Sequence, residues 1–195
     1  FDLKALMKRY REGCKAEDDF KAALTVEKGE KASFTIDGKE QACRGYEVTV
    51  SKEAMINFLR TSSDFFLQDE VLKKDFLKRL ELSVKLSQLA GAQMEGQDFP
   101  TAQEMQEQTY EEARTEIDGM IAFLDSSLND VSMTVYVDKE GCLASVKGTT
   151  SFNSTGSEAE AVQLQFGCEL KGGAYPTQNM SAQAVLENGA ASVQI

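Results

Sequence analysis

Apolar and polar residues alternate along three neighbouring stretches in the last third of the chain. Residues 162–170 are apolar at every second position, and residues 131–137 follow the same period of two. This period is typical of a β-strand with one face on a core and the other in water. An Asp-Lys-Glu-Gly turn at 138–141 leads into a third alternating stretch, 142–152. The pattern predicts an antiparallel meander with one apolar face.

The first 50 residues are predicted to form a short helix followed by a β-hairpin. Apolar positions within residues 1–12 have helical spacing. Residues 32–36 alternate, and the Asp-Gly dipeptide at 37–38 is a strong hairpin signal. Residues 20–26 are ambiguous between helix and strand, and we favour a strand there.

Between residues 51 and 130 the apolar period changes from 2 to 3.6, which is typical of helices. Ser51 is suited to cap a first short helix, and the polar stretch 61–64 is predicted to interrupt it. The next helix is expected to end near Leu89.

The longest predicted helix begins after Pro100. Thr101 is followed by Glu104 three residues later, which has the form of a capping box. An apolar stripe then continues to Leu128, and the opposite face is acidic. Two long helices joined by a loop are expected to form an antiparallel hairpin.

These elements predict the α+β class: a curved antiparallel β-sheet, half-barrel-like, with a long antiparallel helix pair inserted and packed on one face. No repeat or low-complexity linker divides the sequence. We therefore predict one α+β domain over residues 1–195. Its three segments are the N-terminal helix and hairpin (1–50), the helical segment (51–130) and the meander (131–195).

The chain is acidic, with 21 basic and 32 acidic residues and a net charge of -11. Residues 61–130 hold 15 of the acidic residues. A chain without a basic stripe repels a phosphate backbone, so nucleic acid is not an expected partner. No apolar run approaches the length of a membrane span. Because the sequence starts at Phe1 and lacks an initial methionine, we expect it to be an excised or processed fragment.

The sequence contains no histidine. Ser-His-Asp and Cys-His arrangements are therefore excluded, and no glycine-rich phosphate loop is present. Carboxylates remain as acid-base candidates, but their positions are those of solvated faces of amphipathic helices. We predict a protein that is not an enzyme and that uses no cofactor and no metal.

The four cysteines are too far apart in sequence for a zinc site, which needs close ligand pairs. Cys142 and Cys168 fall on the apolar face of the meander and are interpreted as small core residues. An even count also permits disulfides. Cys14–Cys43 is the pairing we favour, and four free thiols are the alternative.

Three stretches carry a resemblance: Gly45–Ser51 (GYEVTVS), Met133–Gly141 (MTVYVDKEG) and Gly172–Pro176 (GGAYP). They resemble Gram-positive cell-envelope lipoproteins of unassigned function with a LolA-like half-barrel. The resemblance implies an extracytoplasmic protein of the cell envelope whose concave sheet, closed by helices, could hold an apolar ligand. It transfers no catalytic residue.

Two functions follow as hypotheses. The first is a non-catalytic cell-envelope binding module that holds an apolar or small ligand between the concave sheet and the helices. The alternative is a structural or protein-interaction domain of a larger surface protein, with another surface protein as partner. The predicted ligand-facing residues are aromatic side chains in or beside strands: Tyr46, Tyr136, Phe166 and Tyr175.

Overall fold

The structure is a computed structural model that describes residues 2–89, 100–153, 161–170 and 178–186. The chain divides into two compact units, which are described separately below. The helical unit comprises Phe1–Asp18 and Asn57–Ala122, and the sheet unit comprises Asp19–Ile56 and Phe123–Ile195. Because three helices each contribute residues to both units, the single-domain interpretation stays a prediction.

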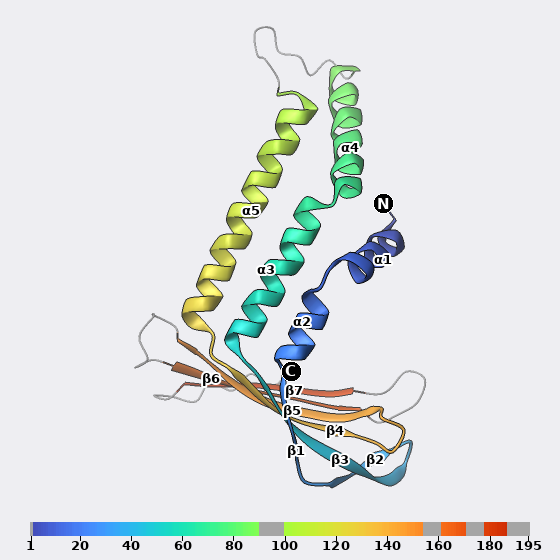
Figure 1. Cartoon of the computed structure of the whole chain (residues 1–195), viewed down its shortest axis with the longest axis vertical. Coiled ribbons are helices and arrows are strands. Elements are labelled where there is room, and N and C mark those ends of the chain that lie inside the picture. The colour runs from blue at the N-terminus through green and yellow to red at the C-terminus, as the bar shows by residue number, and fades with distance from the viewer. Residues whose placement is uncertain (1, 90–99, 154–160, 171–177, 187–195) are drawn as a thin grey trace. The chain divides into compact units, whose positions relative to one another are not determined.

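The sheet unit is built on an antiparallel, curved and unclosed sheet (Figure 1). Six strands follow one another in the order β1-β3-β4-β5-β6-β7, and β2 pairs with the first residues of β3. The predicted α+β class with a half-barrel-like sheet is therefore confirmed. The strands are β1 (Thr25–Lys28), β2 (Ala32–Ile36), β3 (Lys39–Val50), β4 (Val131–Val137), β5 (Leu143–Asn153), β6 (Ala161–Leu170) and β7 (Gln178–Leu186).

The predicted meander is confirmed as β4, β5 and β6, and its pairing is nearly regular. β3 pairs with β4, and β5 with β6, without any shift of register. The one irregularity in this ladder lies between Tyr136 and Val137, where β4 meets the start of β5. Directly opposite residues share a face of the sheet, so the register decides which side chains can meet.

The turn between β2 and β3 has the geometry that its sequence predicts. Asp37 and Gly38 both have positive φ, 50° and 72°. Two consecutive positive φ values are characteristic of a type I′ turn, whose twist suits a two-residue hairpin. Gly38 adopts this conformation without strain because it has no Cβ.

A second glycine is required by a close approach of two backbone segments. A Cβ atom on Gly45 would collide with the carbonyl oxygen of Glu30 and would press on the Tyr136 ring. The amide of Gly29 also donates a hydrogen bond of 2.9 Å to the Gly45 carbonyl. Gly45 thus lets the connection between β1 and β2 lie directly against β3.

The five helices are α1 (Leu3–Gly13), α2 (Ala16–Ala23), α3 (Lys52–Gln68), α4 (Glu70–Leu89) and α5 (Ala102–Ser127). Our strand prediction for residues 20–26 was wrong over its first half, where α2 continues to Ala23. Two alanines at 22 and 23 favour the helix, and the strand β1 begins only at Thr25. No helix within the described residues is both long and apolar enough to cross a membrane.

The predicted interruption at residues 61–64 was also wrong, because α3 continues through it to Gln68. The break lies instead at Asp69. The Asp69 carboxylate accepts a hydrogen bond of 2.7 Å from the amide of Leu72 and so caps α4. The polar residues 61–64 stay helical partly because they find partners: Ser62 bonds Tyr10, and Asp64 pairs with Arg114.

Asp69 also joins α1 to the junction between α3 and α4. The Arg9 guanidinium donates to both carboxylate oxygens, at 2.8 and 3.0 Å. The Asp69 side chain is only 5% exposed. The hydrogen bonds from Arg9, followed by those from the α4 backbone, lower the pKa of Asp69 below its ordinary value.

Aromatic contacts also connect α1 to the end of α3 within the helical unit. The Tyr10 ring stacks on Phe66 with centroids 5.2 Å apart and meets the edge of Phe65 at 5.6 Å. Its hydroxyl lies 3.0 Å from that of Ser62. Tyr10 is only 5% exposed. Its buried hydroxyl needs a hydrogen-bond partner, and Ser62 provides one.

The antiparallel pair of α4 and α5 is confirmed, and α5 begins with the predicted capping box (Figure 1). The Thr101 amide donates to the Glu104 carboxylate at 2.7 Å, and the Glu104 amide donates back to the Thr101 hydroxyl at 3.2 Å. Across the pair, the rings of Phe76 and Tyr110 lie 6.0 Å apart.

We expect Asp69→Ala to lower the free energy of unfolding by at least the roughly 1 kcal/mol typical of a lost N-cap. Asp69→Asn keeps a capping oxygen but loses the charge that binds Arg9, so its effect should be smaller. Urea denaturation followed by circular dichroism at pH 7 measures both. Coincident curves for Asp69→Ala and the parent chain would contradict the assignment.

The same variants give a pH dependence. Because folding lowers the pKa of Asp69, its stabilising contribution is complete above the unfolded pKa of about 3.9 and is lost as pH falls through the folded pKa. The stability difference between the parent chain and Asp69→Asn should therefore shrink as the pH is lowered from 7 towards 3. If this stability difference stays constant, the charge of Asp69 does not contribute to the stability of the fold.

Gly45→Ala should destabilise the sheet unit, because the new methyl group meets a backbone oxygen that has little freedom to move. Overpacking of this kind typically costs about 1–3 kcal/mol. Gly119→Ala is a matched control: no atom lies within 4 Å of its added Cβ, and it sits within α5. That variant should gain up to about 1 kcal/mol. Thermal unfolding of both distinguishes the close approach from a general effect of losing glycine.

Candidate functional site

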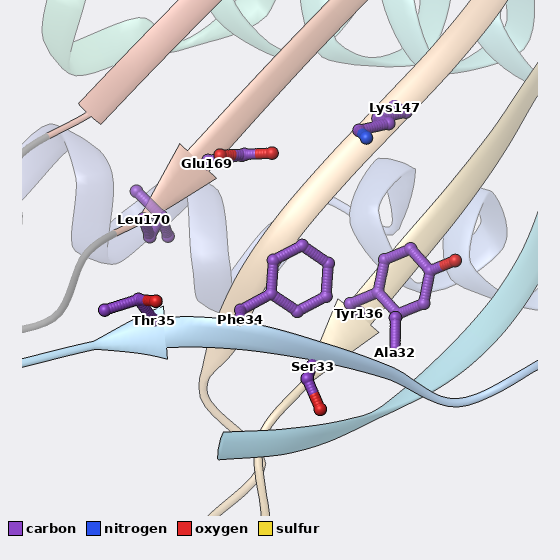
Figure 2. Close-up of a pocket in the computed structure, with 8 residues that line it drawn as sticks. All are labelled: Ala32, Ser33, Phe34, Thr35, Tyr136, Lys147, Glu169 and Leu170. Atoms are coloured by element: carbon purple, nitrogen blue, oxygen red, sulfur yellow. The ribbon is translucent and has the colours of Figure 1, made fainter. Parts of the chain in front are cut away.

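The candidate site is a hollow of about 590 Å³ in the sheet unit. β2 supplies one side of it, and the ends of β4, β5 and β6 supply the other (Figure 2). Its lining residues are Ala32, Ser33, Phe34, Thr35, Tyr136, Lys147, Glu169 and Leu170. The volume lies within the range of about 300–1,000 Å³ that is common for small-molecule sites.

The apolar part of the hollow is a pair of aromatic rings. The Phe34 and Tyr136 centroids are 5.0 Å apart and their planes are inclined by 53°. Both rings pack against a small core of Ile36, Cys43 and Ala144, of which Cys43 and Ala144 are 1% exposed. The core therefore supports both rings, and both residues also line the hollow (Figure 2).

The polar part consists of two opposite charges. Lys147 on β5 and Glu169 on β6 lie across the hollow from Phe34 on β2 (Figure 2). Lys147 is directly opposite Gly167, and Glu169 is directly opposite Ser145, so the two side chains are diagonal neighbours on one face. Among the described residues, neither forms an ion pair with the other or with a third side chain.

A buried hydroxyl lies in the same row of residues. Ser145 is paired with Tyr136 on one side and with Glu169 on the other, so all three share a face of the sheet. Its side chain is 0% exposed, and its Oγ has no hydrogen-bond partner in the described part of the chain. A buried polar group without a partner is uncommon and unfavourable.

The thiol next to the hollow is not an activated nucleophile. Burial, and then the negative charge of Asp138, raises the pKa of Cys43 above its ordinary value. The thiol therefore stays protonated, whereas nucleophilic chemistry needs the thiolate. The Asp138 carboxylate itself accepts backbone hydrogen bonds from Glu140 and Cys142, at 3.0 and 2.8 Å.

Of the predicted ligand-facing residues, Tyr136 lines the hollow. Tyr46 is paired with Val135 and Phe166 with Gly148, which places both on the opposite face of the sheet from Tyr136 and Lys147. Tyr175 lies outside the described residues. Contact with a ligand stays a prediction for all four.

We did not predict Phe34, Lys147 or Glu169 as site residues from the sequence. In the sequence, Phe34 has the pattern of an ordinary apolar strand residue. Lys147 and Glu169 have the pattern of polar residues on the solvent-exposed face of the meander. Only the register that brings Lys147 and Glu169 to neighbouring positions, together with β2 on the opposite side, distinguishes them.

All four cysteines are free thiols in the structure. Cys142 is exposed, so its interpretation as a core residue was wrong. It belongs to the turn, because β5 begins only at Leu143 after the irregularity beside Val137. Cys168 is partly buried. Cys14 and Cys43 belong to different units, and their disulfide stays a prediction.

A second cleft, of about 440 Å³, lies in the helical unit between the α3–α4 junction and α5. Its two basic residues are already paired: Lys73 with Glu70 at 3.0 Å, and Arg114 with Asp64 at 2.6 Å. Burial raises the pKa of Tyr110, which also lines it. Among the described residues, the charges without an ion pair in this cleft are both acidic, Glu107 and Glu111, whereas the hollow of the sheet unit has one charge of each sign.

Comparisons with protein-family models, curated proteins and solved structures find no match to this chain. Within the described residues, no group of three or more His, Cys, Asp or Glu side chains is placed to hold a metal ion. The assignment of the site therefore rests on its geometry.

A thiol reagent should distinguish the cysteines of the native protein. We expect Cys142 to react fast because it is exposed, and Cys43 to react at least ten times more slowly, since it is buried and its pKa is raised. Cys142→Ser should remove the fast phase, and Cys43→Ser should leave it unchanged. In denaturant, four reactive thiols would rule out the Cys14–Cys43 disulfide, whereas two would support it.

Proposed function

We propose that this protein is a non-catalytic binding module of the cell envelope that holds a small ligand in the hollow of its sheet unit. The observation that carries the proposal is the combination of an aromatic pair, Phe34 and Tyr136, with two opposite charges in the lining of one cavity. Ligand sites combine apolar surface with placed polar groups. This hollow has both, and polar groups make up the larger part of its lining.

A binding role is supported over a catalytic one by the chemistry of the lining. The sequence provides no histidine as a general base. The adjacent Cys43 thiol is held protonated. The cell-envelope location is part of the proposal and rests on the resemblance to envelope lipoproteins with a LolA-like half-barrel.

The aromatic pair should bind the apolar part of a ligand. Benzyl alcohol, a neutral aromatic probe, should shift the ring-proton resonances of Phe34 and Tyr136 saturably in an NMR titration. Phe34→Ala should weaken this binding about tenfold or more, since a buried aromatic contact contributes on the order of 1–3 kcal/mol.

Phe123 is the matched control for this titration, because it is an exposed aromatic residue (60%) of the same unit that does not line the hollow. Phe123→Ala should leave probe binding unchanged. Equal, non-saturating shifts at Phe34, Tyr136 and Phe123 would show that the hollow does not bind the probe. Circular dichroism of each variant verifies that the sheet is intact.

A second candidate function, an interaction domain that docks another surface protein, is favoured by one observation. Leu82, Leu86 and Leu89 recur on one side of α4 and are 58%, 57% and 85% exposed. Exposed apolar stripes of this kind are typical of helix-docking surfaces. Leu86→Glu separates the candidates, because a ligand-binding module keeps its ligand affinity in that variant.

A further inference from the structure

We infer that the ligand of the hollow is a small zwitterion with an aromatic or aliphatic side group, such as a free amino acid or a dipeptide. This inference rests on the proposed function and adds the chemical class of the ligand. It follows from three features: two opposite charges that form no ion pair among the described residues, an aromatic pair that lines the same cavity, and a buried hydroxyl on a residue paired with two of the lining residues.

The two charges define the polar end of the ligand. Lys147 and Glu169 are diagonal neighbours on adjacent strands, an arrangement in which the Cα atoms are about 7–8 Å apart. No nitrogen-oxygen pair of theirs lies within the 4.0 Å of an ion pair. A ligand carrying both an ammonium and a carboxylate can fit between them and pair with each.

A ligand with one charge fits less well. It would bind one of the two side chains and cover the other without giving it a partner. Burying a charge that is not paired is strongly unfavourable. Direct pairing of Lys147 with Glu169 competes only weakly, because exposed ion pairs contribute about 0–1 kcal/mol.

The aromatic pair defines the apolar end. Phe34 of β2 lies across the hollow from the charges, and Tyr136 of β4 lies beside them on the same face of the sheet. The side group of a zwitterion can therefore contact both rings while its charged groups bind Lys147 and Glu169 (Figure 2). Aromatic and aliphatic groups both gain from contact with such rings. The volume of about 590 Å³ admits ligands up to a dipeptide.

The buried hydroxyl of Ser145 is a further reason to expect a polar group of the ligand near this row of residues. Its hydroxyl has no hydrogen-bond partner within the described residues, and its neighbours across the strands, Tyr136 and Glu169, both line the hollow. A small shift of the lining when a ligand binds would let this hydroxyl donate to a carboxylate or a peptide carbonyl. Such a bond would relieve an unfavourable burial.

Isothermal titration calorimetry on the full chain tests the inference with four probes that share a phenyl ring and carry different charges. They are phenylalanine, 2-phenylethylamine, 3-phenylpropionate and benzyl alcohol, with the dipeptide Phe-Phe as a larger zwitterion. We expect at least one zwitterion to bind ten times or more tightly than either singly charged probe, since each charge-assisted hydrogen bond adds roughly a tenfold effect.

Two variants assign the charges. Lys147→Gln should weaken zwitterion binding about tenfold and remove the advantage of the zwitterion over 2-phenylethylamine. Glu169→Gln should do the same relative to 3-phenylpropionate. Lys139→Gln is the matched control, because Lys139 is exposed, lies in the β4–β5 turn and does not line the hollow. Its zwitterion affinity should equal that of the parent chain.

The outcomes separate this inference from the proposed function. If benzyl alcohol binds as tightly as the zwitterions, and the charge variants have no effect while Phe34→Ala does, the zwitterion is wrong and the binding module stands. If no probe binds, both are overturned. If zwitterions bind but the Lys147 and Glu169 variants leave their affinity unchanged, the site of binding is elsewhere and the inference fails.

Discussion

The register from β3 through β4 and β5 to β6, regular up to the shift after Tyr136, is the constraint on which the sheet unit depends. In an antiparallel ladder, directly opposite residues share a face, and a shift by one residue would exchange the faces of a whole strand. This register places Tyr136, Ser145 and Glu169 in one row across three strands. That alignment sets the charges of the hollow and the position of Tyr136, and β2 adds Phe34.

The helical unit depends on a different kind of constraint, a single carboxylate used twice. Asp69 caps α4 and binds Arg9 of α1, so one side chain sets where α3 ends and holds a separate helix beside that end. The neighbouring stack of Tyr10 on Phe66 is apolar and less directional. The Arg9–Asp69 pair therefore fixes the orientation of α1, and the aromatic rings contribute the buried apolar surface.

Elements whose causes are local in sequence could be predicted. The Asp37-Gly38 turn and the Thr101–Glu104 capping box each need only three or four consecutive residues, and both were predicted. The meander could be predicted because alternation over its strands is a strong signal. The half-barrel-like class followed from these elements in order.

What the sequence could not supply were the features that join distant residues. Arg9 and Asp69 are 60 residues apart, so the break at Asp69 could not be told from a break at the equally polar stretch 61–64. Likewise Lys147 and Glu169 carry no local mark of a site. Their meaning comes from strand register and from β2 on the far side of the hollow, both of which are tertiary facts.

The unpartnered hydroxyl of Ser145 has a consequence for how this sheet could be engineered. An alanine at position 145 would bury the same backbone without leaving a polar atom unsatisfied. The serine therefore lowers the stability of the fold relative to alanine. Sites that bind or react are commonly where chains give up stability for polarity. A search for a more stable version of this protein would therefore replace Ser145 early, and would thereby remove a hydroxyl that lies between two strands whose paired residues, Tyr136 and Glu169, line the hollow.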